Sequence, residues 1–253
     1  DGTGALTPGN ARGADVVTDC MSASLADLDG DGRLDLYIAT VTGQLALVDS
    51  DDGYTDVAEA WGLPTFSGAQ MPWGSAVGDT DNDGDVDILL ATGDFQEGTA
   101  GPVYPLLHLS QTAPGIWTED GAARGLPQAA NTRAVLRVDL NDDGVLDILA
   151  SDISRSPHVL LSEGCTAAGW LAVAVPDGSR VEIEVAGEVH TAMAAAHPGL
   201  SSSRPPLGHF GLGDAEVVDR VRAFVPWVGE VVLEGPIPGR QQITWSPDSQ
   251  SQQ

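Results

Sequence analysis

Three short aspartate-rich segments are the residues most able to do chemistry in this 253-residue chain. They begin at Asp27, Asp79 and Asp139, 52 and 60 residues apart, and each follows the pattern D-x-[DN]-x-D-G-x-x-D. The three nine-residue windows hold 13 of the chain's 27 aspartates. Such crowding of carboxylates is unfavourable unless a cation relieves the repulsion, so the pattern predicts binding of a divalent ion.

Calcium fits this pattern because it takes six to eight oxygen ligands at about 2.3–2.6 Å. Side chains at positions one, three and five of a curled loop can meet at one centre, and position seven offers its backbone carbonyl. The acid at position nine closes the shell with both oxygens, and glycine at position six permits the positive φ of a sharp turn. We expect about three calcium ions. The predicted ligands are Asp27, Asp29, Asp31, Arg33, Asp35, Asp79, Asp81, Asp83, Asp85, Asp87, Asp139, Asn141, Asp143, Val145 and Asp147.

Alternatives to a calcium site account for these segments less well. A plain Asp/Gly turn would account for one copy, but three copies with the same spacing favour a metal site. An EF-hand needs an acid at position twelve, where this chain has Ile38, Leu90 and Ala150. Magnesium disfavours cages made only of protein ligands, and softer metals prefer His or Cys. We expect the calcium to be structural, because its binding then contributes to the free energy of folding.

The remaining polar residues form no catalytic pattern in the sequence. HExxH, GxSxG and P-loop motifs do not occur. His108 and His158 lie in apolar segments typical of packed strands, and His190, His197 and His209 have no catalytic partner at a recognisable spacing. We predict that the chain is not an enzyme and has no catalytic residues. The six tryptophans are expected to pack between repeats, with a carbohydrate-stacking platform as the alternative.

The composition limits the classes of partner. Asp and Glu number 37 against 11 basic residues, all Arg, which gives a net charge of −26. Nucleic acids are not expected as partners, since they need clustered Lys and Arg. No apolar run approaches the roughly 18 residues that span a bilayer, so membrane insertion is not expected. Cys20 and Cys165 match no metal or redox motif, and both a disulfide and two free thiols stay open.

The elements that position the loops have the pattern of short β-strands. Each loop lies between two apolar runs of three to five residues, which is typical of strands joined in a hairpin. A second, weaker repeat relates residues 54–64 to residues 117–127 at the same internal spacing. The first 160 residues contain no convincing 3.6-residue apolar period, so this part is expected to be β.

The loops, the strand after each, and the Gly-Leu-Pro ends at 62–64 and 125–127 resemble the FG-GAP/VCBS repeats of integrin-α-like β-propellers. This resemblance covers residues 15–164 and implies about one four-stranded blade per repeat, with the metal in a loop between strands. Because propellers generally close with four to eight blades, three repeats predict an open or truncated arc. Residues 1–4 look like the tail of an earlier repeat, so the chain is expected to be a processed product or a piece of a longer protein.

The C-terminal stretch resembles the ASPIC/UnbV domain that follows such repeats in cartilage-acidic-protein-like proteins. The segments that carry the resemblance are GWLAV at 169–173, GSRVEI at 178–183, HFGLG at 209–213, VVDRV at 217–221 and PWVG at 226–229. The alternation of apolar and acidic residues in 181–185 independently predicts a strand. The expected fold class is all-β: a partial, open or truncated, β-propeller of about three calcium-loop blades, followed by a small β-domain.

The expected domain divisions follow from the repeats and the resemblance. They are 1–14 as the tail of a preceding repeat, 15–64, 65–127 and 128–164 as three repeats, 165–245 as the ASPIC/UnbV-like domain, and 246–253 as a disordered tail. The predicted function is a calcium-binding, non-catalytic interaction or adhesion module of an exported protein, secreted or at the cell surface. Its partner is expected to be a protein or a glycan. The alternative is an accessory domain of a biosynthetic or hydrolytic enzyme system, as the UnbV resemblance implies.

Overall fold

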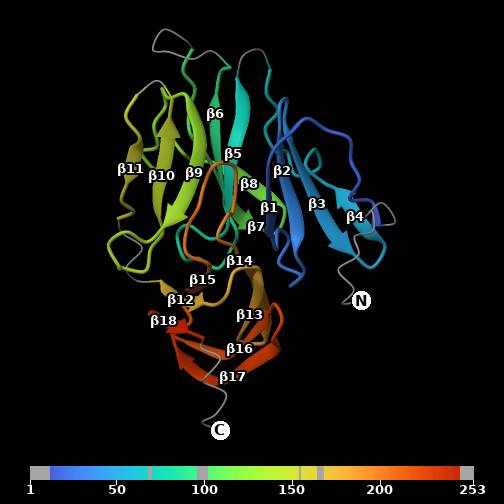
Figure 1. Ribbon diagram of the computed structural model, residues 1–253, viewed down its shortest axis with the longest axis vertical. Coiled ribbons are helices and arrows are strands. Elements are labelled where there is room, and N and C mark those ends of the chain that lie inside the picture. Colours follow the sequence, from blue (N-terminus) through green and yellow to red (C-terminus); the bar gives the residue numbers. More distant parts are fainter. Residues whose placement is uncertain (1–11, 68–69, 96–101, 154, 164–167, 246–253) are drawn as a thin grey trace.

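The computed structural model describes residues 12–67, 70–95, 102–153, 155–163 and 168–245 (Figure 1). Every named element in these ranges is a β-strand, which confirms the all-β prediction for them. Within the same ranges, no helix has the length and hydrophobicity to cross a membrane. Cys20 is exposed. Most of the predicted N-terminal tail, Cys165 and the polar segment 246–253 lie outside the described residues.

The first sheet is a meander of four antiparallel strands in chain order. Its strands are β1 (Cys20–Ala26), β2 (Asp35–Thr40), β3 (Gln44–Ser50) and β4 (Gly53–Asp56). Burial alternates along β1, whereas β2 is buried almost throughout, as expected for a strand that is covered on both faces. This order of strands is that of a propeller blade.

Two further sheets repeat the meander, one of four strands and one of three. Their strands are β5 (Met71–Val77), β6 (Ile88–Gly93), β7 (Leu107–Ala113), β8 (Ile116–Glu119), β9 (Thr132–Val138), β10 (Asp147–Asp152) and β11 (His158–Leu160). All six residues of β6 are buried, in keeping with its continuous apolar sequence.

Each aspartate-rich segment joins the first two strands of its sheet. We name these segments loop 1 (27–35), loop 2 (79–87) and loop 3 (139–147). The pairs that close the three hairpins are Ala26↔Asp35, Val77↔Ile88 and Val138↔Asp147. The hairpins predicted from the flanking apolar runs are therefore confirmed.

Apolar cores lie between successive sheets. One cluster joins Leu28 and Tyr37 of the first sheet to Ile88 of the second. Trp61 and Trp117 pack against this cluster with their ring centroids 6.1 Å apart. The prediction that tryptophans pack between repeats is confirmed for this pair. A second cluster joins the second and third sheets, and its largest members are Leu89, Leu106, Leu126 and Ile148.

Two sheets share a single apolar core in the C-terminal part. One has the order β15-β12-β18, with β12 antiparallel to β15 and parallel to β18, and the other has the order β14-β13-β16-β17. The strands are β12 (Gly169–Ala174), β13 (Ser179–Val185), β14 (Glu188–Ala194), β15 (Leu207–Gly213), β16 (Val217–Val225), β17 (Gly229–Pro238) and β18 (Gln241–Thr244). The strand predicted over 181–185 is confirmed as part of β13.

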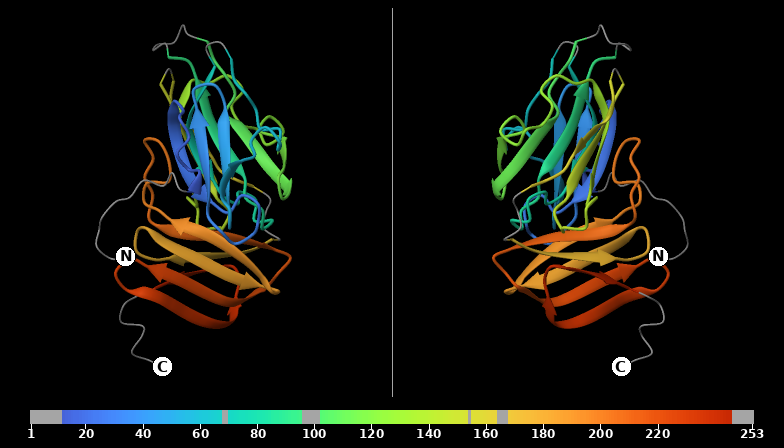
Figure 2. Two further views of the ribbon diagram at one scale, coloured as in Figure 1. Left: turned by 90° about the vertical axis from the view of Figure 1, so that its right-hand side faces the viewer. Right: turned by 90° about the vertical axis from the view of Figure 1, so that its left-hand side faces the viewer.

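The C-terminal sheets lie against one end of the three meander sheets, as the views in Figures 1 and 2 agree. All three loops are at this end. Thr191 on β14 donates a hydrogen bond to the carbonyl of Gly32 at 2.8 Å, and the amide of Gly213 donates to the carbonyl of Asn82 at 2.9 Å. The loops therefore form the boundary between the two parts of the chain.

Candidate metal centres

Carboxylate oxygens converge in two of the three loops. In loop 2, Asp79, Asp81 and Asp87 each offer an oxygen within 4.8 Å of the others. In loop 1, Asp27, Asp29 and Asp31 do the same. Three anionic oxygens at this separation are a donor set that suits a hard divalent cation.

Loop 3 differs because an amide replaces the second carboxylate. The Nδ2 atom of Asn141 donates to Asp143 Oδ2 at 2.9 Å, while Asn141 Oδ1 accepts from the amide of Asp143 at 3.3 Å. The side-chain oxygen of an asparagine is also a calcium ligand. At positions one, three, five and nine, loop 3 thus keeps the oxygen donors of loops 1 and 2 with one fewer acid.

The aspartate at position one curls each loop by accepting backbone hydrogen bonds. Its Oδ2 atom accepts from the amide of the position-six glycine, at 2.9 Å for Gly32, 2.9 Å for Gly84 and 2.8 Å for Gly144. Its Oδ1 atom accepts from amides three or four residues ahead, such as those of Gly30 and Asn82. Aspartate forms such turns with its own backbone readily. The loop conformation is therefore encoded in the chain itself.

The aspartate at position nine braces the hairpin. Asp35, Asp87 and Asp147 are completely buried. One oxygen of each accepts from the position-two amide, at 2.7, 2.9 and 2.8 Å. The other accepts from the amide of Asp49 on β3, Gln111 on β7 or Ser162 after β11, at 2.8, 3.2 and 2.8 Å. An ionised carboxylate has about four lone-pair sites, so about two remain for an ion at Asp35 and Asp147. About one remains at Asp87, which also accepts a hydrogen bond from the Thr80 hydroxyl.

Positive φ angles occur at two positions of every loop. At position six, Gly32, Gly84 and Gly144 have φ of 86°, 100° and 84°, which confirms the conformation predicted for these glycines. At position four, φ is 75° for Gly30, 63° for Asn82 and 59° for Asp142. These are the residue types that enter the left-handed region at least cost.

The electrostatic cost of these carboxylates is high without a cation. Burial, followed by repulsion from Asp87, raises the pKa of Asp79 to about 7. Burial also raises the pKa of Asp27 to about 7 and that of Asp83 to about 6. A raised carboxyl pKa means that the charged form is disfavoured. A bound divalent cation would stabilise the charged form and lower the pKa again.

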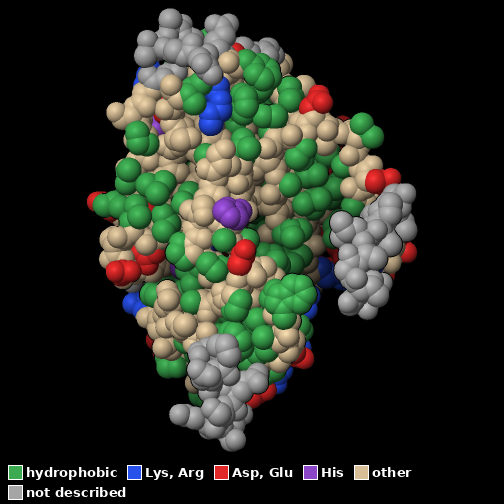
Figure 3. Space-filling view, in the orientation of Figure 1, with side chains coloured by type: hydrophobic (Ala, Val, Ile, Leu, Met, Phe, Trp, Pro, Cys, Tyr) green, Lys and Arg blue, Asp and Glu red, His purple; other side chains and the backbone are tan. Residues whose placement is uncertain are grey.

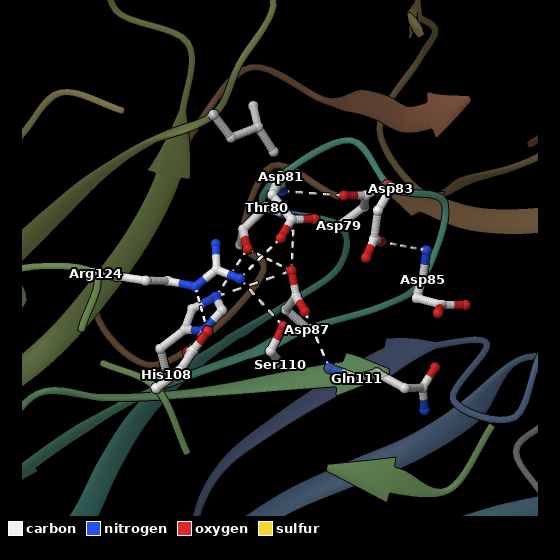
Figure 4. Close-up of polar contacts among 12 residues, drawn as sticks. Asp79, Thr80, Asp81, Asp83, Asp85, Asp87, His108, Ser110, Gln111 and Arg124 are labelled. Carbon is white, nitrogen blue, oxygen red and sulfur yellow. Dashed lines mark hydrogen bonds and ion pairs between the residues drawn. The ribbon is translucent and has the colours of Figure 1, made fainter. Parts of the chain in front are cut away.

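A buried histidine network supports loop 2 from the neighbouring strand (Figure 4). His108 on β7 is 1% exposed, and its Nε2 atom lies 2.8 Å from Thr80 Oγ1. Its Nδ1 atom lies 2.6 Å from Asp120 Oδ1. Thr80 Oγ1 also donates to Asp87, so its hydroxyl proton is already engaged. The Asp–His–Thr order resembles a catalytic relay, but the buried hydroxyl serves to hold the position-nine carboxylate.

Arg124 links the same network to the loop carboxylates. Its Nε atom donates to Asp120 at 2.6 Å, and its Nη2 atom donates to Asp81 at 2.8 Å and to Ser110 at 3.2 Å. Asp81 is thereby held beside Asp79 and Asp87 (Figure 4). A cation in loop 2 would share Asp81 with this guanidinium.

Asn82 connects loop 2 to loop 3 and to the C-terminal sheets. Its side chain is fully buried, donates to the carbonyl of Gly144 at 3.0 Å and lies 2.9 Å from His209 Nε2. The ring of His209 stacks on that of Trp170, with centroids 6.1 Å apart and an interplanar angle of 14°. One position-four residue therefore joins three parts of the fold.

The predicted ligands fall into groups with different surroundings. Six of them form the two convergent carboxylate groups of loops 1 and 2, while Asp35 lies outside the loop 1 group. At position seven, Arg33 pairs with Asp51 at 2.7 Å and the side chain of Val145 is buried, so only their carbonyls are candidate ligands. Calcium coordination by these residues stays a prediction.

Sequence reasoning missed the residues that support the loops from outside. Asn82, His108 and Arg124 were not among the predicted site residues, because their contacts are made between segments distant in the chain. One signal was available. Position four was treated as unspecified, yet it is Gly, Asn and Asp in the three loops, which are the types that accept positive φ.

Comparison with known proteins identifies two segments. Residues 27–90, which hold loops 1 and 2, match an FG-GAP-like repeat, and residues 174–251 match the family described as ASPIC and UnbV. No curated protein matches the chain. The two matches confirm the resemblances that the sequence motifs indicated.

Proposed function

We propose that this chain, which carries an FG-GAP-like repeat and an ASPIC and UnbV domain, is a non-catalytic interaction module stabilised by calcium. The observation that carries the proposal is the convergence of three aspartate oxygens in loop 1 and again in loop 2. Loop 3, with Asn141 in place of one acid, is the proposed third site. The ligands are those at positions one, three, five, seven and nine, and calcium supplies the positive charge that the buried carboxylates require.

The position of the loops supports a structural role for the ions. Loop 1 accepts the hydrogen bond from Thr191, and Asn82 of loop 2 contacts both loop 3 and His209. Ordering of the loops by calcium therefore also orders the surface on which the C-terminal sheets rest. Loss of calcium is proposed to loosen this boundary as well as the hairpins themselves.

The three meander sheets are proposed to be blades of an open or truncated propeller arc, spanning residues 15–64, 65–127 and 128–164. Residues 165–245 form the proposed small β-domain at the end of the arc. A blade arc offers a broad outer surface, and FG-GAP repeats commonly act as protein-interaction modules, so the proposed partner is a protein or a glycan. The proposed location is extracellular, where calcium is abundant enough for weak sites.

The surface agrees with such partners better than with polyanions. On the face shown in Figure 3, basic side chains are few and separated, and acidic and apolar side chains are interspersed. The net charge of −26 acts in the same direction, because it repels nucleic acids.

Thermal unfolding in calcium and after its removal tests the proposed role. A site held at a hundred times its Kd adds about 2.7 kcal/mol, which corresponds to a rise in Tm of about 5–10 °C for a chain of this size. Asp79→Asn is expected to lose most of the increment due to loop 2. The matched control is Asp52→Asn, which removes the same charge from the exposed turn between β3 and β4.

Two results of these melting experiments would contradict the proposed role of calcium. Equal melting curves with and without calcium would show that the ion contributes nothing to folding. An Asp52→Asn variant that lost as much of the calcium response as Asp79→Asn would show that the response is not specific to the loops.

A further inference from the structure

A cavity of about 650 Å³ lies where loops 1 and 2 meet β14 and β15. Its size is within the range of small-molecule sites, roughly 300–1,000 Å³. Apolar side chains form part of its lining, among them Val77, Val189 and Phe210. The cavity adjoins both convergent carboxylate groups, because Asp27, Asp31 and Asp79 are among its lining residues.

Two arginines on opposite sides of the boundary line this cavity. Arg137 on β9 is 8% exposed and donates to the carbonyl of Asp79 at 3.0 Å and to that of Val77. Arg204, between β14 and β15, has a buried Nε atom that makes no hydrogen bond within the described part of the chain. Its Nη2 atom makes one long contact, 3.4 Å, with the carbonyl of Leu207. Most of the N–H donors of these two guanidiniums therefore have no protein acceptor in that part of the chain.

Neither arginine has a carboxylate partner among the described residues. The ion pairs found there involve other arginines, among them Arg12, Arg33, Arg124, Arg180, Arg220 and Arg222. This is unexpected in a chain with 37 acidic and 11 basic residues. A buried charge without a directly paired counterion is costly, and neither guanidinium forms such a pair, although carboxylates also line the cavity.

The two guanidiniums line the same cavity from different parts of the chain. His209 lines the same cavity, and burial together with both arginines lowers its pKa to about 3. His209 is therefore neutral beside the pair and does not add to the positive charge.

Five carboxylates also line the cavity. They are Asp27, Asp31, Asp79, Asp85 and Glu188. Three of them, Asp27, Asp31 and Asp79, are side-chain ligands of the proposed calcium ions. With calcium bound, Asp85 and Glu188 would be the carboxylates of this lining that no ion engages, and this part of the argument rests on the proposed function.

We propose that this cavity binds a small organic oxyanion, a carboxylate or a sulfate or phosphate ester, through Arg137 and Arg204. Planar guanidinium groups bind such oxyanions through paired charge-assisted hydrogen bonds. The apolar lining accommodates the organic portion of the ligand. The bound anion would bridge β9 of the third meander sheet and the segment before β15, and would thus reinforce the boundary between the two parts of the chain.

Isothermal titration with three probes tests this proposal. Sulfate and benzoate are expected to bind saturably, whereas benzamide, which has the shape of benzoate without the charge, is not. Binding of benzoate alone would identify a carboxylate ligand, and binding of sulfate alone would identify a tetrahedral one. Each titration is run in calcium and after removal of calcium by a chelating resin, because soluble chelators are themselves polyanions.

Two variants distinguish anion binding in the cavity from a general effect of positive charge on the surface. Arg204→Gln is expected to weaken anion binding by at least about tenfold, since it removes one paired contact. Arg220→Gln is the control, because it removes the same charge from an exposed position on β16 that pairs with Glu184 and Glu234. Without an anion, Arg204→Gln should melt no lower than the parent chain, as expected when an uncompensated buried charge is removed.

Several results would overturn the proposal. The first is that the parent chain binds neither anion saturably. The second is that Arg204→Gln binds the anions as tightly as the parent chain. The third is that benzamide binds as tightly as benzoate. Anion binding that persists without calcium supports the cavity whatever the result for the ions, and calcium binding is measured separately, so the two proposals fail independently.

Discussion

Gly211 on β15 is the point of closest packing between the C-terminal sheets and loop 2. A Cβ atom at this position would overlap Asp79 Oδ2 and the backbone of Asn82. Its φ is not in the left-handed region, so Gly211→Ala introduces a steric conflict without backbone strain. The variant therefore measures how much the docking of β15 on loop 2 contributes to stability.

The expected destabilisation follows from the atoms that must move. Overpacking costs about 1–3 kcal/mol, and the upper part of this range applies because the obstructing atoms belong to the backbone of a braced loop. Alanine also lowers the conformational entropy of the unfolded chain, which raises the free energy of unfolding by about 0.4–1 kcal/mol. The net effect is about 2 kcal/mol, or a fall in Tm of about 4–8 °C for a chain of this size.

Thermal unfolding followed by tryptophan fluorescence measures this change, with Gly208→Ala on the same strand as the control. A Cβ atom at Gly208 would lie 3.2 Å from Phe210 Cε2 and 3.3 Å from Val181 Cβ, contacts that require shifts of only a few tenths of an ångström. This control is expected to stay within about 1 kcal/mol of the parent chain. Equal melting of Gly211→Ala and the parent would refute the docking of β15 on loop 2.

Two further contacts around the loops give predictions of their own. His108→Gln is expected to cost about 2–3 kcal/mol in chemical denaturation, because Thr80 and Asp120 lose a buried partner; His158→Gln, at a less buried histidine 3.4 Å from Asp152, should cost less than about 1 kcal/mol. Equal losses of unfolding free energy in the two variants would show that the His108 network stabilises the fold no more than the His158 contact does. Thr191→Val keeps the side-chain shape but removes the bond to Gly32 and should cost about 1 kcal/mol. An unchanged denaturation midpoint would argue against this bond.

The hairpins and the loop conformation were predictable from local sequence. Short apolar runs flank each loop, and Asp at position one with Gly at position six specifies a turn whose closing hydrogen bonds are short-range. Alternation of apolar and acidic residues gave the strand at 181–185. These features depend on neighbours within about ten residues, which is the range over which a pattern carries information.

The supports of the site were not predictable because they depend on long-range contacts. His108 meets Thr80 across two strands, and Asn82 meets His209 from a position 127 residues away in the chain. The position of Arg137 and Arg204 in the lining of one cavity also depends on how the two parts of the chain pack together. A single sequence contains no pattern that specifies such a meeting.

Counting the calcium ions bound at saturation by equilibrium dialysis addresses the central claim most directly. The structure-based proposal expects about three ions per chain, and one fewer for Asp79→Asn. A chain that takes up no calcium at millimolar concentration would contradict the claim, because the acidic loops would then hold their conformation without an ion.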